Sequence, residues 1–137
     1  MSEEEAYNEV CGYTLSHGDK SFIHQHVVDA YAAQHANEKT KPISLTFALV
    51  GLYLLIEKQF SGRQVQQAHI QLARYKQKWP VFVLPEDRGS VTAIEVVTAA
   101  EGPERDKAIH SWCASVWAQY INNRDKIAEL LHKHGII

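Results

Sequence analysis

One stretch organises this chain, and it reads Phe22-Ile23-His24-Gln25-His26-Val27-Val28-Asp29-Ala30-Tyr31-Ala32-Ala33-Gln34-His35. It places three histidines, an aspartate, a tyrosine and two glutamines among residues that otherwise form an apolar helical pattern. At about 100° per residue, His24, Tyr31 and His35 share one face of the predicted helix. His26 lies about 160° around the helix from His24. This polar cluster is the best functional clue in the sequence.

The composition is that of one globular domain, which we expect to span residues 1–137. The chain is 45% hydrophobic and carries a formal charge of -2, with a pI of about 6.4. No run of Lys or Arg forms a basic arm, so we expect no nucleic-acid partner. The longest apolar run, Ile43 to Ile56, is shorter than the roughly 20 residues that span a bilayer. We therefore expect no membrane partner.

The two cysteines, Cys11 and Cys113, are too few for a disulfide framework, and no Cys-x-x-Cys motif is present. The acidic start of the chain has no apolar core of a signal peptide. We predict a cytoplasmic protein in which the two cysteines are not bonded to each other. Cys113 is expected to be a buried, inert packing residue, and Cys11, in a region predicted to be a loop, the more reactive thiol.

Hydrophobic periodicity predicts helices throughout the chain. Residues 1–19 carry turn signals and are expected to be irregular, with Asp19 or Ser21 capping the helix that runs to about His35. Residues 43–60 are apolar nearly all round, which predicts the buried central helix. Capping-box patterns mark two further helices, from Ser61 to about residue 78 and from Thr92 to about residue 100.

Two prolines bound the apolar stretch 79–85, which predicts an extended strap laid over the helices. Pro103 and the acids after it open the last and longest helix, which is expected to continue to Gly135. Strand signals are sparse. The sequence therefore predicts an all-α fold, an antiparallel four- to five-helix bundle with the strap across it.

Three spaced motifs resemble a known family. They are the pattern from His24 through Asp29, Tyr31 and Gln34 to His35, the pair Trp79-Pro80, and the Trp112 to Trp117 segment. The chain is similar over about residues 11–132 to an uncharacterised bacterial helical family, domain of unknown function 5946. The resemblance implies no activity. Some members carry paired cysteines near the N-terminus, where this chain has only Cys11.

A metal centre is the sharpest hypothesis for the polar residues. Zinc or another divalent transition metal takes three or four His, Asp, Glu or Cys ligands, and a helical bundle supplies them from several helices. His24 and His35 lie about 16 Å apart along one helix and cannot share an ion. The candidate ligands are His35, His69 and His110, with Asp106 one turn before His110 to orient its ring.

The alternative is a buried network without catalysis. Asp29 and Gln34 must find partners if they are buried, and Tyr31, His69 and Arg124 are candidates. A third hypothesis is a small-molecule pocket beneath the strap, formed by aromatic residues. These residues are Tyr75, Trp79, Phe82, Trp112, Trp117 and Tyr120.

We expect a non-catalytic module that binds a small ligand or a protein partner. The sequence leaves open whether it also forms a homo-oligomer. The alternative function is a metal-dependent or histidine-based enzyme centred between the first, third and last helices. The expected binding residues are His24, Asp29, Tyr31, Gln34, His35, His69 and His110.

Overall fold

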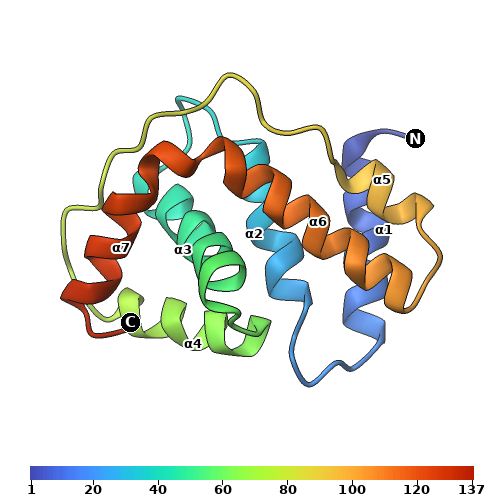
Figure 1. Cartoon of the computed structure of the whole chain (residues 1–137), viewed down its shortest axis with the longest axis horizontal. Coiled ribbons are helices and arrows are strands. Elements are labelled where there is room, and N and C mark those ends of the chain that lie inside the picture. The colour runs from blue at the N-terminus through green and yellow to red at the C-terminus, as the bar shows by residue number, and fades with distance from the viewer.

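The computed structural model describes residues 1–137 and is all-α, without any strand, as the sequence predicts (Figure 1). Seven α-helices follow one another, and a 3-10 turn, Ile121–Asn123, joins the last two. The helices are α1 (Glu3–Ser16), α2 (His24–Gln34), α3 (Pro42–Lys58), α4 (Gly62–Ala73), α5 (Ala93–Thr98), α6 (Pro103–Gln119) and α7 (Arg124–Lys133). None of them is long and apolar enough to cross a bilayer.

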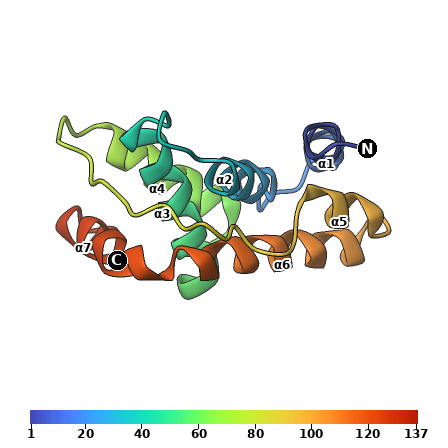
Figure 2. The ribbon, with the colours of Figure 1, turned by 90° about the horizontal axis from the view of Figure 1, so that it is seen from above.

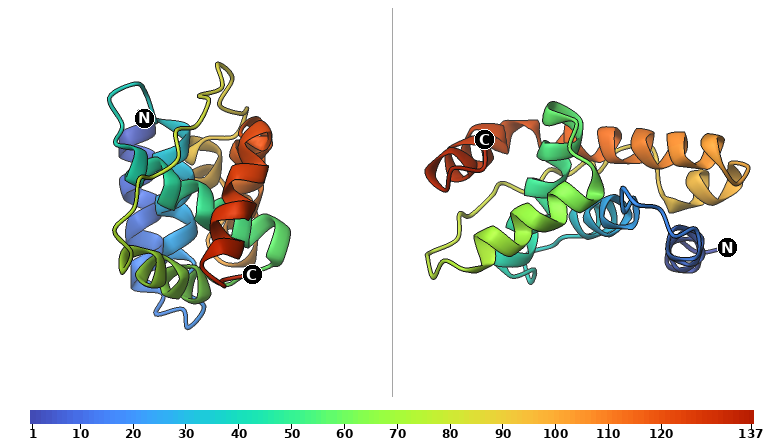
Figure 3. Two further views of the ribbon diagram at one scale, coloured as in Figure 1. Left: turned by 90° about the vertical axis from the view of Figure 1, so that its left-hand side faces the viewer. Right: turned by 90° about the horizontal axis from the view of Figure 1, so that it is seen from below.

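The helices lie on two sides of the molecule. Helices α6 and α7 run along one side, while α1, α2 and α4 lie on the other (Figures 2 and 3). Helix α3 contacts α2, α4, α6 and α7, and nine of its residues are buried, more than in any other helix. The prediction of a buried central helix is confirmed. Helix α2 contacts α1, α3, α4 and α6, so its polar residues meet most of the fold.

Both predicted capping boxes are present. Ser61 Oγ accepts from the Gln64 backbone N–H at the start of α4, and Thr92 Oγ1 accepts from Ile94 N–H at the start of α5. The predicted cap of α2 is wrong, because Ile23 occupies the N-cap position without a side-chain bond. Asp19 instead accepts from the backbone of Ser21 and Ile23 and stabilises the loop before α2.

The prediction that residues 1–19 are irregular is wrong, because α1 forms there. Ser2 caps the helix and three glutamates occupy its first turn, which suits the positive end of the helix dipole. Ala6, Val10 and Tyr13 are buried at helical spacing. The turn signal at Gly12 misled the prediction, since an isolated glycine is tolerated inside a helix whose face is buried.

The predicted single last helix is in fact two. It breaks after Gln119, where Asn122 and Asn123 are poor helix formers and the backbone tightens into the 3-10 turn. Asn123 is buried and binds the strap with both amide atoms: Oδ1 accepts from Val83 N–H and Nδ2 donates to Val83 C=O, each at 3.0 Å. The break therefore lets the chain receive the strap between α6 and α7.

The predicted strap, residues 79–85, forms neither helix nor strand (Figure 1). Phe82 turns inward and is 7% exposed, while Val81 and Val83 are each 70% exposed. Alternate side chains thus face the core and the solvent. Helix α4 ends at Ala73, five residues before the predicted end, and this gives the strap its length.

Candidate functional site

A pocket of about 320 Å³ lies between the start of α2, the junction of α3 and α4, and α6. Four apolar residues line it: Ile23, Leu55, Phe60 and Ile109. Its polar lining residues are Ser21, His26, Gln59, Ser61, Gln64, Asp106 and His110. We call this the α2–α6 pocket. Its size and its mixture of apolar walls with a few polar groups are typical of small-ligand sites.

Close backbone packing holds one wall of this pocket. Gly62 starts α4 directly against the loop before α2, where a Cβ atom on Gly62 would lie 1.8 Å from the Phe22 carbonyl oxygen. The Arg63 N–H donates to Ser21 C=O at 2.8 Å. The two segments are therefore fixed to each other by main-chain contacts that a side chain at residue 62 would break.

Two strained residues border the same pocket. Phe22 and Gln59 are the only residues other than glycine with positive φ, at 58° and 56°. Such conformations cost roughly 1–2 kcal/mol each and are often found at functional sites. Gln59 lines the pocket directly, and Phe22 lies between two lining residues. The fold thus places its backbone strain around this cavity.

His26 is the buried polar residue of the pocket. The residue is 7% exposed, and its Nδ1 atom is enclosed without a hydrogen-bond partner. Burial lowers the pKa of His26 to about 4, and His110 acts in the same direction while Asp19 opposes them. The ring is therefore neutral at pH 7.

Asp29 lies deeper, between α2 and α3. Its Oδ1 accepts from Gln25 Nε2 at 3.1 Å, but Oδ2 has no partner and faces Gly51. A Cβ atom on Gly51 would lie 1.8 Å from that oxygen, so α3 approaches Asp29 through a glycine. Burial raises the pKa of Asp29 well above its usual range, which favours the neutral acid.

Burial makes both cysteine thiols hard to ionise. Burial, followed by the nearby Asp29 carboxyl, raises the pKa of Cys113, whose Sγ donates to the His26 carbonyl at 3.5 Å. Burial also raises the pKa of Cys11, which lies in α1 beside Tyr7. The expectation of a loop around Cys11 is wrong, because the residue lies in α1 and is half-buried. Both cysteines are free.

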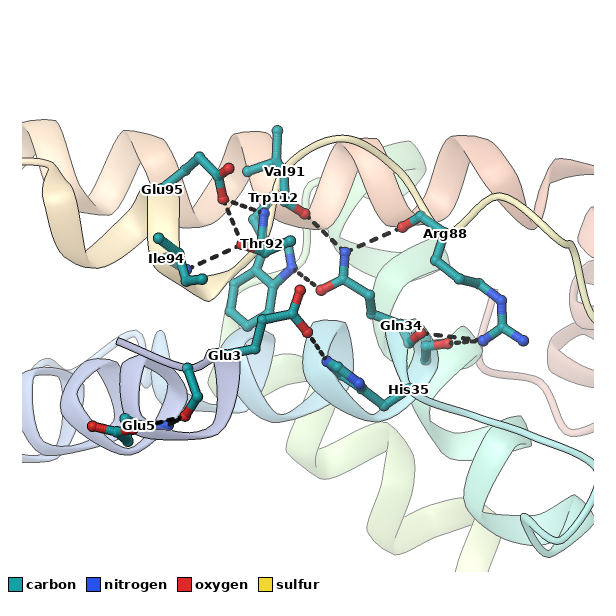
Figure 4. A network of polar contacts seen from close by, with 12 residues as sticks. Glu3, Glu5, Gln34, His35, Arg88, Val91, Thr92, Ile94, Glu95 and Trp112 are labelled. Carbon is teal, nitrogen blue, oxygen red and sulfur yellow. Dashed lines mark hydrogen bonds and ion pairs between the residues drawn. The ribbon is translucent and has the colours of Figure 1, made fainter.

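Gln34 joins α2 to α6 and to the segment after the strap (Figure 4). Its Oε1 accepts from Trp112 Nε1 at 2.9 Å, and its Nε2 donates to the carbonyls of Arg88 and Val91. All of these groups are satisfied within the protein. Gln34 therefore belongs to the structural network that the sequence suggested, although its partners differ from those expected, since Arg124 binds Glu57 instead.

The predicted metal ligands have separate partners. His35 pairs with Glu3 at 3.0 Å (Figure 4), and His69 Nε2 lies 2.7 Å from the Phe47 carbonyl. His110 lines the α2–α6 pocket with His26. No group of three or more His, Cys, Asp or Glu side chains lies close enough to hold a metal ion. The arrangement thus gives the metal hypothesis no support.

The other expected binding residues also have protein partners. His24 Nδ1 lies 2.9 Å from Thr14 Oγ1, and the Tyr31 ring stacks on Tyr7 with ring centroids 3.8 Å apart. Of the seven expected residues, His110 is the one that lines the α2–α6 pocket.

The proposed aromatic pocket under the strap is mostly core. Trp112, Trp117 and Tyr120 are at most 3% exposed. A different pocket of about 230 Å³ does lie beside the strap. Its polar lining residues are Asn37, Glu38 and Thr40, and the Asn37 N–H donates to Thr40 Oγ1. Neither of the enclosed unpartnered atoms lines this pocket.

Sequence reasoning missed His26, which is the central polar residue of the pocket. The available signal was its position nearly opposite His24 on the helix, away from the face that His24 and His35 share. The start of α4 contributes Ser61 and Gln64 to the same pocket. Their capping box predicted where the helix begins, but it did not predict that α2 and α6 pack beside it.

The fold and this pocket define a class: an all-α protein with a small, partly apolar cavity that encloses an unpartnered histidine. The chain belongs to the family of unknown function DUF5946, whose model matches residues 4–121. The resemblance seen in the sequence is thereby confirmed. No curated protein and no solved structure is significantly similar to the chain.

Proposed function

We propose that this protein is a non-catalytic binding module that takes a small organic molecule into the α2–α6 pocket. One observation carries the proposal: His26, a buried histidine in the pocket wall, has no protein partner for its ring. A buried polar group without a partner costs about 1–3 kcal/mol, and a ligand that bound the ring at Nε2, the nitrogen that is not enclosed, would give His26 a partner.

Several features support binding rather than covalent chemistry. The thiol of Cys113 is fully buried, and burial raises its pKa, so it is a poor nucleophile. The strained residues Phe22 and Gln59 shape the pocket without contributing a reactive group. We further propose that the helices form an antiparallel bundle and that the protein acts in the cytoplasm without nucleic acid or membrane as a partner.

A thermal-shift screen of small organic molecules on the full chain tests the proposal. We expect at least one compound to raise the melting temperature of the wild type, because a ligand that binds only the folded state stabilises it. Leu55→Trp should fill the pocket and abolish the shift, whereas Ile70→Trp, on an exposed position of α4, should keep it. Equal shifts in all three proteins, or none in any, would overturn the proposal.

A histidine-based enzyme is the second candidate, because His26 and His110 line one pocket and could act as a base and an acid. Hydrolysis of small activated esters tests it. An enzyme of this kind should lose at least about a hundredfold in rate in both His26→Gln and His110→Gln. His132→Gln, at an exposed position of α7, serves as the control. Equal rates in all variants would exclude this candidate.

A further inference from the structure

The α2–α6 pocket offers its ligand hydrogen-bond donors. We infer that the ligand is a small carboxylic acid with an apolar body, bound as the carboxylate by His26, Ser61 and Gln64. This inference rests on the proposed function and names the chemical class of the ligand. Free donors on three side chains support it.

The first donor is His26. Its Nδ1 atom is enclosed and has nothing to bind, so a proton there would be a buried donor without an acceptor. We therefore assign the proton of the neutral ring to Nε2, the nitrogen that is not enclosed. The ring lines the pocket, and it then presents an N–H group to whatever occupies the cavity.

The other two donors follow from the capping box of α4. Ser61 Oγ already accepts from Gln64 N–H at 3.2 Å, and Gln64 Oε1 already accepts from Ser61 N–H at 2.8 Å. The cap thus uses one acceptor of each side chain. The Ser61 hydroxyl hydrogen and the Gln64 amide hydrogens remain free. Both side chains line the pocket at the positive end of the α4 dipole, which favours an anion.

The other polar lining residues are Ser21, Gln59, Asp106 and His110, and the first two already donate hydrogen bonds within the protein. The Ser21 hydroxyl donates to Asp19 at 2.6 Å, and Gln59 Nε2 donates to Ile56 C=O at 3.3 Å. Asp106 is the only acidic residue in the lining, and its Oδ1 accepts from the Tyr13 hydroxyl at 2.8 Å. Four apolar side chains complete the walls, so the body of the ligand should be apolar.

A matched set of probes tests the class of ligand: phenylacetate, phenylacetamide and phenethylamine, titrated into the full chain and followed by amide NMR. We expect phenylacetate to bind at least about tenfold more tightly than the amide, since charge-assisted hydrogen bonds are roughly twice as strong as neutral ones. The shifts should centre on Ser61, Gln64 and His26.

Gln64→Glu is the decisive variant. Glutamate at this position preserves the capping box but replaces the free amide donors by a carboxylate oxygen. Phenylacetate should then bind at least about tenfold more weakly and phenethylamine more tightly. Gln67→Glu, exposed on α4 and outside the pocket, adds the same charge and should change neither affinity by more than about twofold.

Tighter binding of the amide or amine by the wild type would overturn the carboxylate assignment and leave the binding function standing. Failure of all three probes would also overturn the assignment. The wider thermal-shift screen, with its Leu55→Trp comparison, separately decides whether the pocket binds any ligand.

Discussion

Gly51 of α3 packs directly against Asp29 of α2. Because a Cβ atom at residue 51 would lie 1.8 Å from Asp29 Oδ2, Gly51→Ala should destabilise the protein by about 3 kcal/mol. Asp29→Ala in the same chain should relieve part of this loss, giving a coupling energy above about 1 kcal/mol in urea denaturation.

Gly12→Ala is the matched control, because Gly12 is also helical but a Cβ atom added there would have no other atom within 4 Å. It should be neutral or stabilising by up to about 1 kcal/mol. Equal effects of the two substitutions would show that the contact at Gly51 is unimportant.

Burial of Asp29 gives a predictable dependence of stability on pH. Its folded pKa is raised, so the folded state keeps a proton that the unfolded chain releases near pH 3.8. The free energy of unfolding therefore falls as pH rises from that value through the folded pKa. Asn has no such proton, so the stability of Asp29→Asn relative to wild type should increase with pH. Parallel stability curves between pH 4 and 8 would contradict this.

His26 has the opposite dependence. The unfolded chain gains a proton below about pH 6.5, whereas the folded ring gains one only at about pH 4. Stability is therefore lost as pH falls between these values, by about 3 kcal/mol in total. Leucine has no proton to take up on unfolding, so the stability of His26→Leu relative to wild type should be greater at pH 4.5 than at pH 7.5, measured by urea denaturation. A constant difference would show that His26 titrates normally when folded.

At the scale of helices and loops, Asn123 determines how the strap lies. Asn123→Ala removes two hydrogen bonds to the backbone of Val83, which should cost about 2 kcal/mol. Val83 should also lose protection from amide hydrogen exchange. Asn122→Ala, at the exposed neighbouring position, should change neither quantity. Retained protection of Val83 would mean that other contacts hold the strap.

Element ends were predictable where a local signal sets them. The capping boxes at Ser61 and Thr92 depend on residues three positions apart, so the sequence contains the whole interaction. The break after Gln119 has only a weak local signal in its two asparagines, and the partner that Asn123 binds there, Val83, lies 40 positions away. Helix α1 was not predicted because Gly12 and the many polar residues of this segment indicated a loop. Its few apolar residues form a buried face only through packing against the rest of the chain.

At the scale of the whole molecule, the class of fold was predictable and the site was not. Helical periodicity is repeated along the chain and specifies an all-α structure. The α2–α6 pocket instead combines residues separated by up to 89 positions, from Ser21 to His110. The prediction placed His35 together with His69 and His110 from two other helices. The structure groups them by which helices touch, and this brings His26 to His110 while His35 pairs with Glu3.

Arg88 has a consequence for how the chain folds. Helix α2 has no basic residue in its last turn, yet Arg88 Nη1 donates to the carbonyls of Ala33 and Gln34, and the Tyr120 hydroxyl also donates to Ala33. The end of α2 is thus completed by residues more than fifty positions later in the chain. A nascent α2 emerging from the ribosome lacks these partners, so it should fray until residue 120 has been made. Contacts of such long sequence separation slow folding. Helix α2 should therefore be among the last helices to become ordered.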